Sequence, residues 1–180
     1  TRNTAPCALP ATPACEHRVY VSLGDTKVTL HWEFVDKGNR APGDVRSFRR
    51  GGVVVLGPRD SYTPPESGDF LEVTIKPKRP PIKSPSVLIP PDKNAILFDR
   101  PDFFVFEEKL DPGDTRARHS HRERVVIVLN KTRLQQWPDG AAELLRDQVP
   151  DDVRFNPPVV HVVKTVGELP LRNIVIEFKR

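Results

Sequence analysis

Two histidines one residue apart are the side chains of this sequence best placed to do chemistry. His119 and His121 lie within residues 113–129, which read GDTRARHSHRERVVIVL. On a β-strand, residues i and i+2 project from the same face, so both imidazoles would aim at one point. Imidazole nitrogens are common ligands of transition metals. The spacing therefore predicts part of a metal site.

A third histidine, His161, lies on a later predicted strand over residues 159–166. If that strand lies alongside the first, three imidazoles converge on one cation. Three neutral imidazoles suit a divalent transition metal (Zn, Fe, Ni, Cu or Co) and leave positions open for water or substrate. Glu123 has the same strand parity as the pair and would point inward as a further ligand or as a partner of the ligands, unless a bulge turns it outward. The alternative is a solvated, arginine-rich strand start with no metal.

Other residues near these histidines have structural explanations. By parity, Arg116 and Arg118 alternate away from the histidine face and should lie outside the barrel. Phe104 and Phe106 are expected in the core. We assign no site to His17 or to His31.

The elements around the histidines are predicted to be strands. Twenty prolines in 180 residues argue against long helices. Alternating and β-branched runs predict strands over residues 18–23, 27–34, 45–48, 52–56, 70–76, 95–98, 102–110, 131–137, 152–155, 159–166 and 172–179. Residues 141–148 (AAELLRDQ) predict one short helix. The fold class is therefore an all-β sandwich or barrel.

An internal repeat divides the chain. Residues 17–30 align with residues 123–136, and residues 44–56 align with residues 152–163. Residues 77–91 hold six prolines in fifteen positions and separate the copies as an extended connector. The predicted organisation is a proline-rich leader (1–16), a first module (17–76), the connector (77–91) and a second module (92–180) that carries the three histidines.

The spacing around the first histidine pair resembles the first motif of the cupin superfamily. Gly113 is followed by five residues and then by His119 and His121. Cupins place a glutamate after the second histidine with three or four residues in between, and here Val125 and Val126 occupy those positions. The resemblance implies a metal centre without the usual glutamate ligand.

The surroundings of His161 resemble the second cupin motif more loosely. That motif places a proline and a glycine before the histidine and an asparagine four residues after it. Here Asn156, Pro158 and Thr165 stand at those positions. Together the two motifs imply a double-stranded β-helix (jelly roll), and the repeat implies a bicupin whose degenerate first half lacks the histidines.

The resemblance implies a small metal-binding cupin, and the sequence leaves its activity open. An enzyme of this kind would oxygenate, isomerise or hydrolyse a small organic molecule. The alternatives are a non-catalytic ligand-binding or sensing cupin and a metal-free, vestigial structural module. The net charge of +4 comes from interleaved Lys, Arg, Asp and Glu, which disfavours a nucleic-acid partner. No apolar run in the sequence has the length of a membrane span, which disfavours a membrane partner.

The leader carries the only cysteines, Cys7 and Cys15. In an exported protein they would form a disulfide loop that stabilises the chain by about 2–3 kcal/mol. The absence of methionine and the start at Thr1 favour a processed, secreted or periplasmic protein; the alternative is a cytoplasmic protein with two reduced thiols. Because the first module starts without leading strands, an open sheet edge predicts a homodimer.

Overall fold

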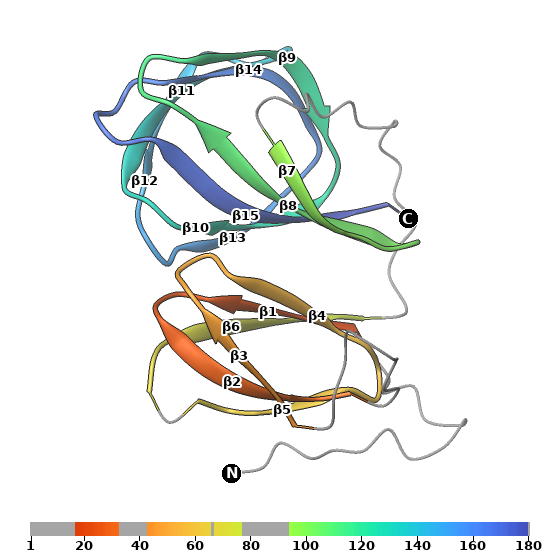
Figure 1. The fold of residues 1–180 in the computed structure, drawn as a ribbon. Coiled ribbons are helices and arrows are strands. Elements are labelled where there is room, and N and C mark those ends of the chain that lie inside the picture. Colours follow the sequence, from red (N-terminus) through yellow and green to blue (C-terminus); the bar gives the residue numbers. More distant parts are fainter. Residues whose placement is uncertain (1–16, 33–42, 66, 77–93, 180) are drawn as a thin grey trace. The chain divides into compact units, whose positions relative to one another are not determined.

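The computed structural model describes residues 17–32, 43–65, 67–76 and 94–179. The chain divides into two compact units, Thr1–Arg79 and Pro80–Arg180. Figure 1 shows that both units are built from strands, and the described residues contain no helix. The chain therefore has the expected all-β class. The predicted leader (1–16) with its two cysteines and the whole predicted connector (77–91) lie outside the described residues.

The first unit consists of two small antiparallel sheets, ordered β4-β1-β6 and β3-β2-β5. Its strands are β1 His17–Ser22, β2 Thr26–His31, β3 Asp44–Phe48, β4 Val53–Leu56, β5 Ser61–Thr63 and β6 Phe70–Ile75. Aromatic rings fill its interior. Tyr20 lies 4.9 Å from Phe70 and 5.5 Å from Tyr62, measured between ring centroids, and is itself fully buried.

The second unit is larger and has two antiparallel sheets, ordered β13-β10-β15-β8-β7 and β12-β11-β14-β9. Its strands are β7 Asn94–Asp99, β8 Phe103–Leu110, β9 Thr115–His121, β10 Arg124–Val128, β11 Thr132–Pro138, β12 Leu144–Gln148, β13 Val153–Asn156, β14 Val159–Thr165 and β15 Leu171–Phe178. Two facing sheets of this kind form the jelly roll that the sequence predicted.

The two units share a strand order. The pairings of β1 with β4 and β6 repeat those of β10 with β13 and β15, and β2 lies between β3 and β5 as β11 lies between β12 and β14. This correspondence favours a repeated module, although duplication itself stays a prediction. The strand order also corrects one sequence alignment, that of residues 44–56 with residues 152–163. Residues 44–56 start with β3, and β3 corresponds to β12. Residues 152–163 instead start at β13, so the two segments are not equivalent in the fold.

The predicted helix over residues 141–148 is wrong. The hairpin turns at Gly140, which has a φ of +69°, and residues Leu144–Gln148 form β12, paired with β11 in the register Gln136↔Leu144 to Thr132↔Gln148. Alanine, leucine, arginine and glutamine favour helices, but helix propensity is a weak influence and strand pairing overrides it here. None of the described residues forms a helix with the length and apolarity needed to cross a membrane.

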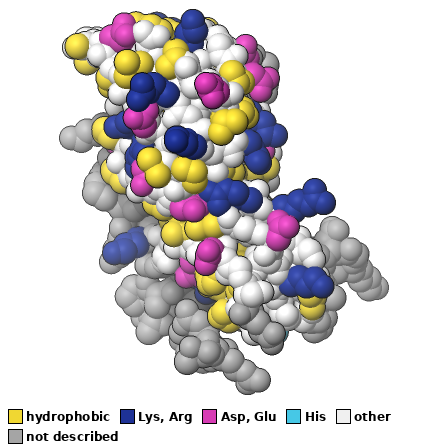
Figure 2. Space-filling model, turned by 90° about the vertical axis from the view of Figure 1, so that its left-hand side faces the viewer, with side chains coloured by type: hydrophobic (Ala, Val, Ile, Leu, Met, Phe, Trp, Pro, Cys, Tyr) yellow, Lys and Arg dark blue, Asp and Glu magenta, His cyan; other side chains and the backbone are white. Residues whose placement is uncertain are grey.

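Both signs of charge are interspersed on the surface. In Figure 2, basic, acidic and apolar side chains alternate over the face shown. Several of the exposed charges are paired along the sheets, as in Arg133 with Asp147 and Arg118 with Asp139. Such exposed pairs contribute little to stability, about 0–1 kcal/mol each.

Candidate metal centre

Strand β9 carries the first two histidines to the inside of the second unit. It follows a turn in which Gly113 has a φ of +83°, a left-handed conformation that glycine adopts without a steric penalty. The N–H of Gly113 donates to the carbonyl of Thr165 (2.8 Å), and the N–H of Thr165 donates to the carbonyl of Asp114 (3.0 Å). These bonds tie the start of β9 to the end of β14. His119 and His121 are both buried, as their shared parity predicts.

Strand β14 brings the third histidine to the same place. His161 lies directly opposite His119 in the antiparallel register of β14 and β9, and directly opposed residues share a face of the sheet. The ring centroid of His161 lies 4.6 Å from that of His119 and 5.5 Å from that of His121. One nitrogen from each ring lies within 4.8 Å of the others. The structure thus gathers the three histidines singled out in the sequence.

Each imidazole is oriented through its Nδ1 atom. An oxygen lies within hydrogen-bonding distance of every Nδ1: the Ala117 carbonyl for His119 (2.8 Å), Glu177 Oε2 for His121 (2.9 Å) and Gln136 Oε1 for His161 (3.2 Å). These oxygens are acceptors, so each Nδ1 is assigned the proton. The Nε2 atoms consequently carry the free lone pairs.

The Nε2 atoms face one another. Those of His119 and His121 are 3.0 Å apart, and that of His161 is buried without a hydrogen-bond partner among the described residues. Two lone pairs at this distance repel each other unless a proton or a cation lies between them. Two nitrogens bound at 2.0–2.1 Å to one ion, at a right angle, lie about 2.9 Å apart, close to the observed distance. The donor set therefore fits a divalent transition metal.

Burial keeps the three rings neutral. It lowers the pKa of His119 to about 4 and the pKa of His121 and of His161 to about 3. Neighbouring positive charge, from Arg124 in the case of His121, adds to the effect. A metal ion needs unprotonated imidazole. At neutral pH it would displace no protons from these rings.

Comparison with solved structures identifies the fold. A cupin 2 conserved barrel domain protein from Leptotrichia buccalis matches with a TM-score of 0.55 and 12% identity, over 94% of this chain and 76% of that one. The chain has the cupin fold. AerE from Microcystis aeruginosa matches with a TM-score of 0.59 and 14% identity, over 98% of this chain and 84% of that one. No protein-family model and no curated protein sequence matches the chain.

The glutamate that is missing from the first motif is not replaced by Glu123. Strand β9 ends at His121 and β10 begins at Arg124, so Glu123 lies in the bend between the strands, where the parity argument no longer applies. Its carboxylate is not among the groups that converge with the histidines. Val126 is buried in an apolar cluster with Phe106.

Glu177 on β15 supplies a carboxylate behind the site instead. Its side chain is fully buried, and its two oxygens accept from the Nδ1 of His121 (2.9 Å) and from the backbone N–H of Arg122 (2.8 Å). Burial raises the pKa of Glu177 to about 7, although the N–H of Arg122 and the charge of Arg124 oppose the rise. Carboxylates in this position fix the tautomer of metal-binding histidines and raise their basicity.

The expectation that Arg116 lies outside the barrel is wrong. The register between β14 and β9 shifts by one residue between His161 and Val163, so β9 contains a β-bulge that reverses the parity before His119. Arg116 is therefore buried and forms an ion pair with Glu108. Burial works to raise the pKa of Glu108, but the charge of Arg116, together with His121, Arg124 and the hydrogen bond from Asn173, outweighs it and lowers the pKa to about 2. Arg118 points outward as expected.

A cavity of about 250 Å³ adjoins the histidines. Its walls include His121 and His161, apolar side chains such as Val126 and Leu134, and a group of polar residues: Glu108, Arg124, Gln136, Arg146, Gln148, Arg154, Asn156 and Asn173. Its volume lies below the ~300–1,000 Å³ typical of sites for drug-sized ligands. The cavity therefore suits a small molecule next to the candidate metal.

The corresponding interior of the first unit is filled. By strand register, Leu30 stands where the second unit has Gln136, and Phe70 stands where it has Asn173. Tyr20 likewise replaces Val126. Large apolar side chains thus occupy the positions that line the cavity in the second unit, and the described part of the first unit is built as a packed core rather than as a site.

Proposed function

We propose that the second unit binds a divalent transition metal through Nε2 of His119, His121 and His161 and presents it to a small organic molecule in the adjoining cavity. One observation carries the proposal: three buried, neutral imidazoles converge, and each is turned to expose Nε2 by an acceptor at its Nδ1. A core histidine that served packing alone would have no reason to leave a buried Nε2 without a partner, as His161 does.

The protein's own residues would prepare the ion in three ways. Glu177, Gln136 and the carbonyl of Ala117 hold the ligand tautomers. Apolar residues of the cavity wall keep the pocket partly dry, which strengthens electrostatic interactions inside it. Three protein ligands leave coordination positions open. When bound, a metal of this class supplies Lewis acidity or activates a bound water.

The cavity offers no obvious acid–base catalyst of its own. Glu108 is the one carboxylate among the residues that form its walls, and the ion pair with Arg116 lowers its pKa to about 2. A group held ionised by an arginine is a weak base at neutral pH. Any reaction in this cavity, whether oxygenation, isomerisation or hydrolysis, would therefore depend on the metal.

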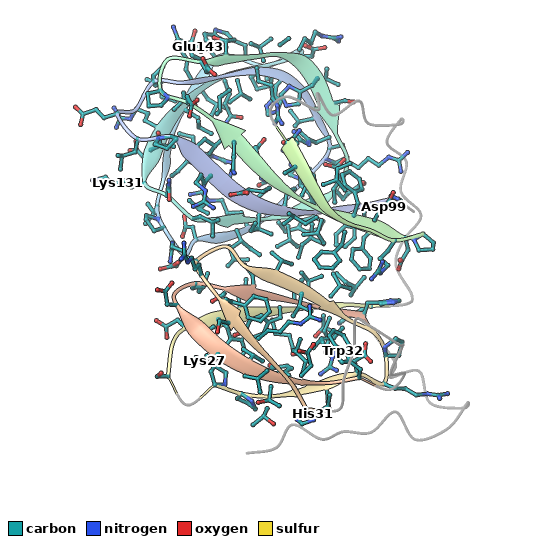
Figure 3. The ribbon with its side chains drawn as sticks, in the orientation of Figure 1. Lys27, His31, Trp32, Asp99, Lys131 and Glu143 are labelled. Carbon is teal, nitrogen blue, oxygen red and sulfur yellow. The ribbon has the colours of Figure 1, made fainter. Side chains whose placement is uncertain are left out.

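Metal analysis of untagged protein tests the proposal. We expect one transition metal ion per chain after loading and dialysis, and loss of the ion in His161→Ala. His31→Ala is the matched control, because His31 lies exposed on β2 of the first unit (Figure 3), where its Nε2 is hydrogen-bonded to Thr63 Oγ1. An absence of metal in the wild type, or its unchanged retention in His161→Ala, would overturn the proposal.

A further inference from the structure

The cavity beside the histidines is rich in arginine. Arg124, Arg146 and Arg154 all contribute to its walls, against the single carboxylate of Glu108. Arg154 is neutralised by Asp152, with 2.5 Å between Nη2 and Oδ2, and Glu108 is already paired with Arg116. Two guanidinium groups therefore remain to set the charge of the pocket.

Arg124 is held at the base of this pocket. It is buried on β10, and its Nη1 donates to the carbonyls of Pro157 (2.9 Å) and Arg122 (3.2 Å). Among the described residues its Nε and Nη2 groups have no hydrogen-bond partner, and no carboxylate lies within ion-pair distance of the guanidinium. Arg124 is thus positioned by its contacts with backbone carbonyls, and its Nε and Nη2 groups remain available to donate to a ligand.

Arg146 approaches from the opposite sheet. It lies on β12 directly opposite Leu134, a buried residue of the cavity wall, so both side chains lie on the inner face. Arg146 is exposed to solvent at the cavity and has no ion pair or hydrogen bond to any described residue. It also repels the positive charge of Arg124. Glu108 and Glu177 attract Arg124, but Glu108 is already paired with Arg116 and Glu177 already accepts from His121 and Arg122. Two such cations beside one pocket are therefore stabilised further by an anionic ligand.

Two amides complete the polar wall. Asn156 lies directly opposite Arg124 in the register of β13 and β10, and Gln148 is buried at the inner end of β12. Neither amide is hydrogen-bonded within the described part of the chain. The remaining wall is aliphatic, with Val126 and Leu134 among its residues. The pocket thus combines two guanidinium groups, two side-chain amides that can donate hydrogen bonds, and a short apolar surface.

We propose that this cavity binds a small organic acid, whose carboxylate is held by Arg124 and Arg146 and whose apolar body lies against the aliphatic wall. Guanidinium groups match carboxylates in shape and charge, and the pairing is stronger away from bulk water. The inference names the substrate class of the site in the proposed function, and it rests on that proposal only in placing the acid beside the metal.

Calorimetric titration of metal-loaded and metal-free protein with butyrate, hexanoate and benzoate, each against its primary amide, tests this assignment. We expect the acids to bind at least about tenfold more tightly than the amides, and Arg146→Ala to weaken acid binding by about tenfold to a hundredfold without changing amide binding. Arg133→Ala is the charge-matched control, because Arg133 pairs with Asp147 on the exposed face of β11.

The outcomes separate this inference from the proposed function. If the protein binds metal but does not prefer acids to amides, the carboxylate assignment is wrong and the metal site stands. If sulfate binds as tightly as the acids, recognition of an organic carboxylate is equally refuted. If no metal binds yet the acids are preferred and Arg146→Ala loses that preference, the metal proposal fails and the carboxylate site stands.

Discussion

Replacing Glu177 by glutamine should weaken metal binding while leaving all three histidines in place. The carboxylate accepts two hydrogen bonds at once, from His121 Nδ1 at 2.9 Å and from the backbone N–H of Arg122 at 2.8 Å. A glutamine has one acceptor oxygen, so its NH₂ group would face one of these two donors. Either His121 loses its orienting partner or the buried N–H of Arg122 is left without an acceptor.

The size of the effect follows from that contact. Loss of such a partner behind a metal-binding histidine typically lowers metal affinity by about 10–100-fold, or roughly 1.4–2.7 kcal/mol. The assay is competition with a chelator of known affinity, above about pH 7, where the carboxyl group of the wild type is ionised. Urea unfolding of the metal-free variant establishes that the fold survives.

A matched control and a clear refutation are available. Glu143→Gln makes the same chemical change at an exposed carboxylate of the second unit (Figure 3). Glu143 accepts from Trp137 Nε1 at 2.8 Å, and its replacement should leave metal affinity unchanged. A folded Glu177→Gln variant that binds metal as tightly as the wild type would refute the role assigned to Glu177.

Three further predictions concern stability and assembly. The metal-free protein should lose stability as pH falls from about 6.5 to about 4, because burial lowers the pKa of each site histidine to about 3 or 4 and the unfolded chain takes up protons first, at up to about 1.4 kcal/mol per pH unit for each ring. The raised pKa of Glu177 has the opposite effect on stability: between about pH 4.5 and 7 it cancels the loss expected from about one histidine. Urea unfolding at several pH values measures the net dependence of stability on pH. A stability that does not change with pH would contradict the neutral state assigned to the rings. Arg116→Leu should lower the unfolding free energy by about 3–5 kcal/mol, because the half-buried carboxylate of Glu108 loses its cationic partner and keeps the amide of Asn173 (2.9 Å); a change below about 1 kcal/mol would argue against the ion pair. The expected homodimer and the Cys7–Cys15 disulfide are checked by the solution-scattering mass and by mass spectrometry before and after reduction; a monomer with two free thiols would contradict both.

Much of the β-architecture could be predicted from local sequence. Strand periodicity and turn residues located most of the strands, and the shared parity of His119 and His121 placed both rings on one face. The approach of His161 depended on strand pairing across about 40 residues of chain, which the cupin resemblance supplied and local patterns do not. These predictions were correct because the alternation of residues along each strand was not interrupted by a bulge or a bend.

The failures have a common physical cause in non-local pairing. A bulge in β9 reversed the parity of Arg116, and a bend between strands removed Glu123 from the face it was assigned. Within the predicted helix, Leu144–Gln148 forms a strand because β11 offers a hydrogen-bonded edge. In each case an interaction with another strand decided the outcome, and propensity within the segment did not.

The sequence of β15 contains a pattern that indicates an internal role for Glu177. On β15, Asn173, Val175 and Glu177 share a face by period two, so two polar residues lie on a face that is otherwise apolar. A buried polar residue requires a partner, and such a pattern predicts an internal contact. Its identity as the partner of His121, 56 residues away, could come only from the folded structure.

The most direct test of the central claim is anomalous X-ray diffraction from crystals of the metal-loaded protein, measured on both sides of the absorption edge of the loaded metal. The proposed site predicts one anomalous peak lying within about 2.0–2.2 Å of the Nε2 atoms of His119, His121 and His161. Crystals of loaded protein with no peak between these three rings, or with the peak elsewhere on the chain, would contradict it.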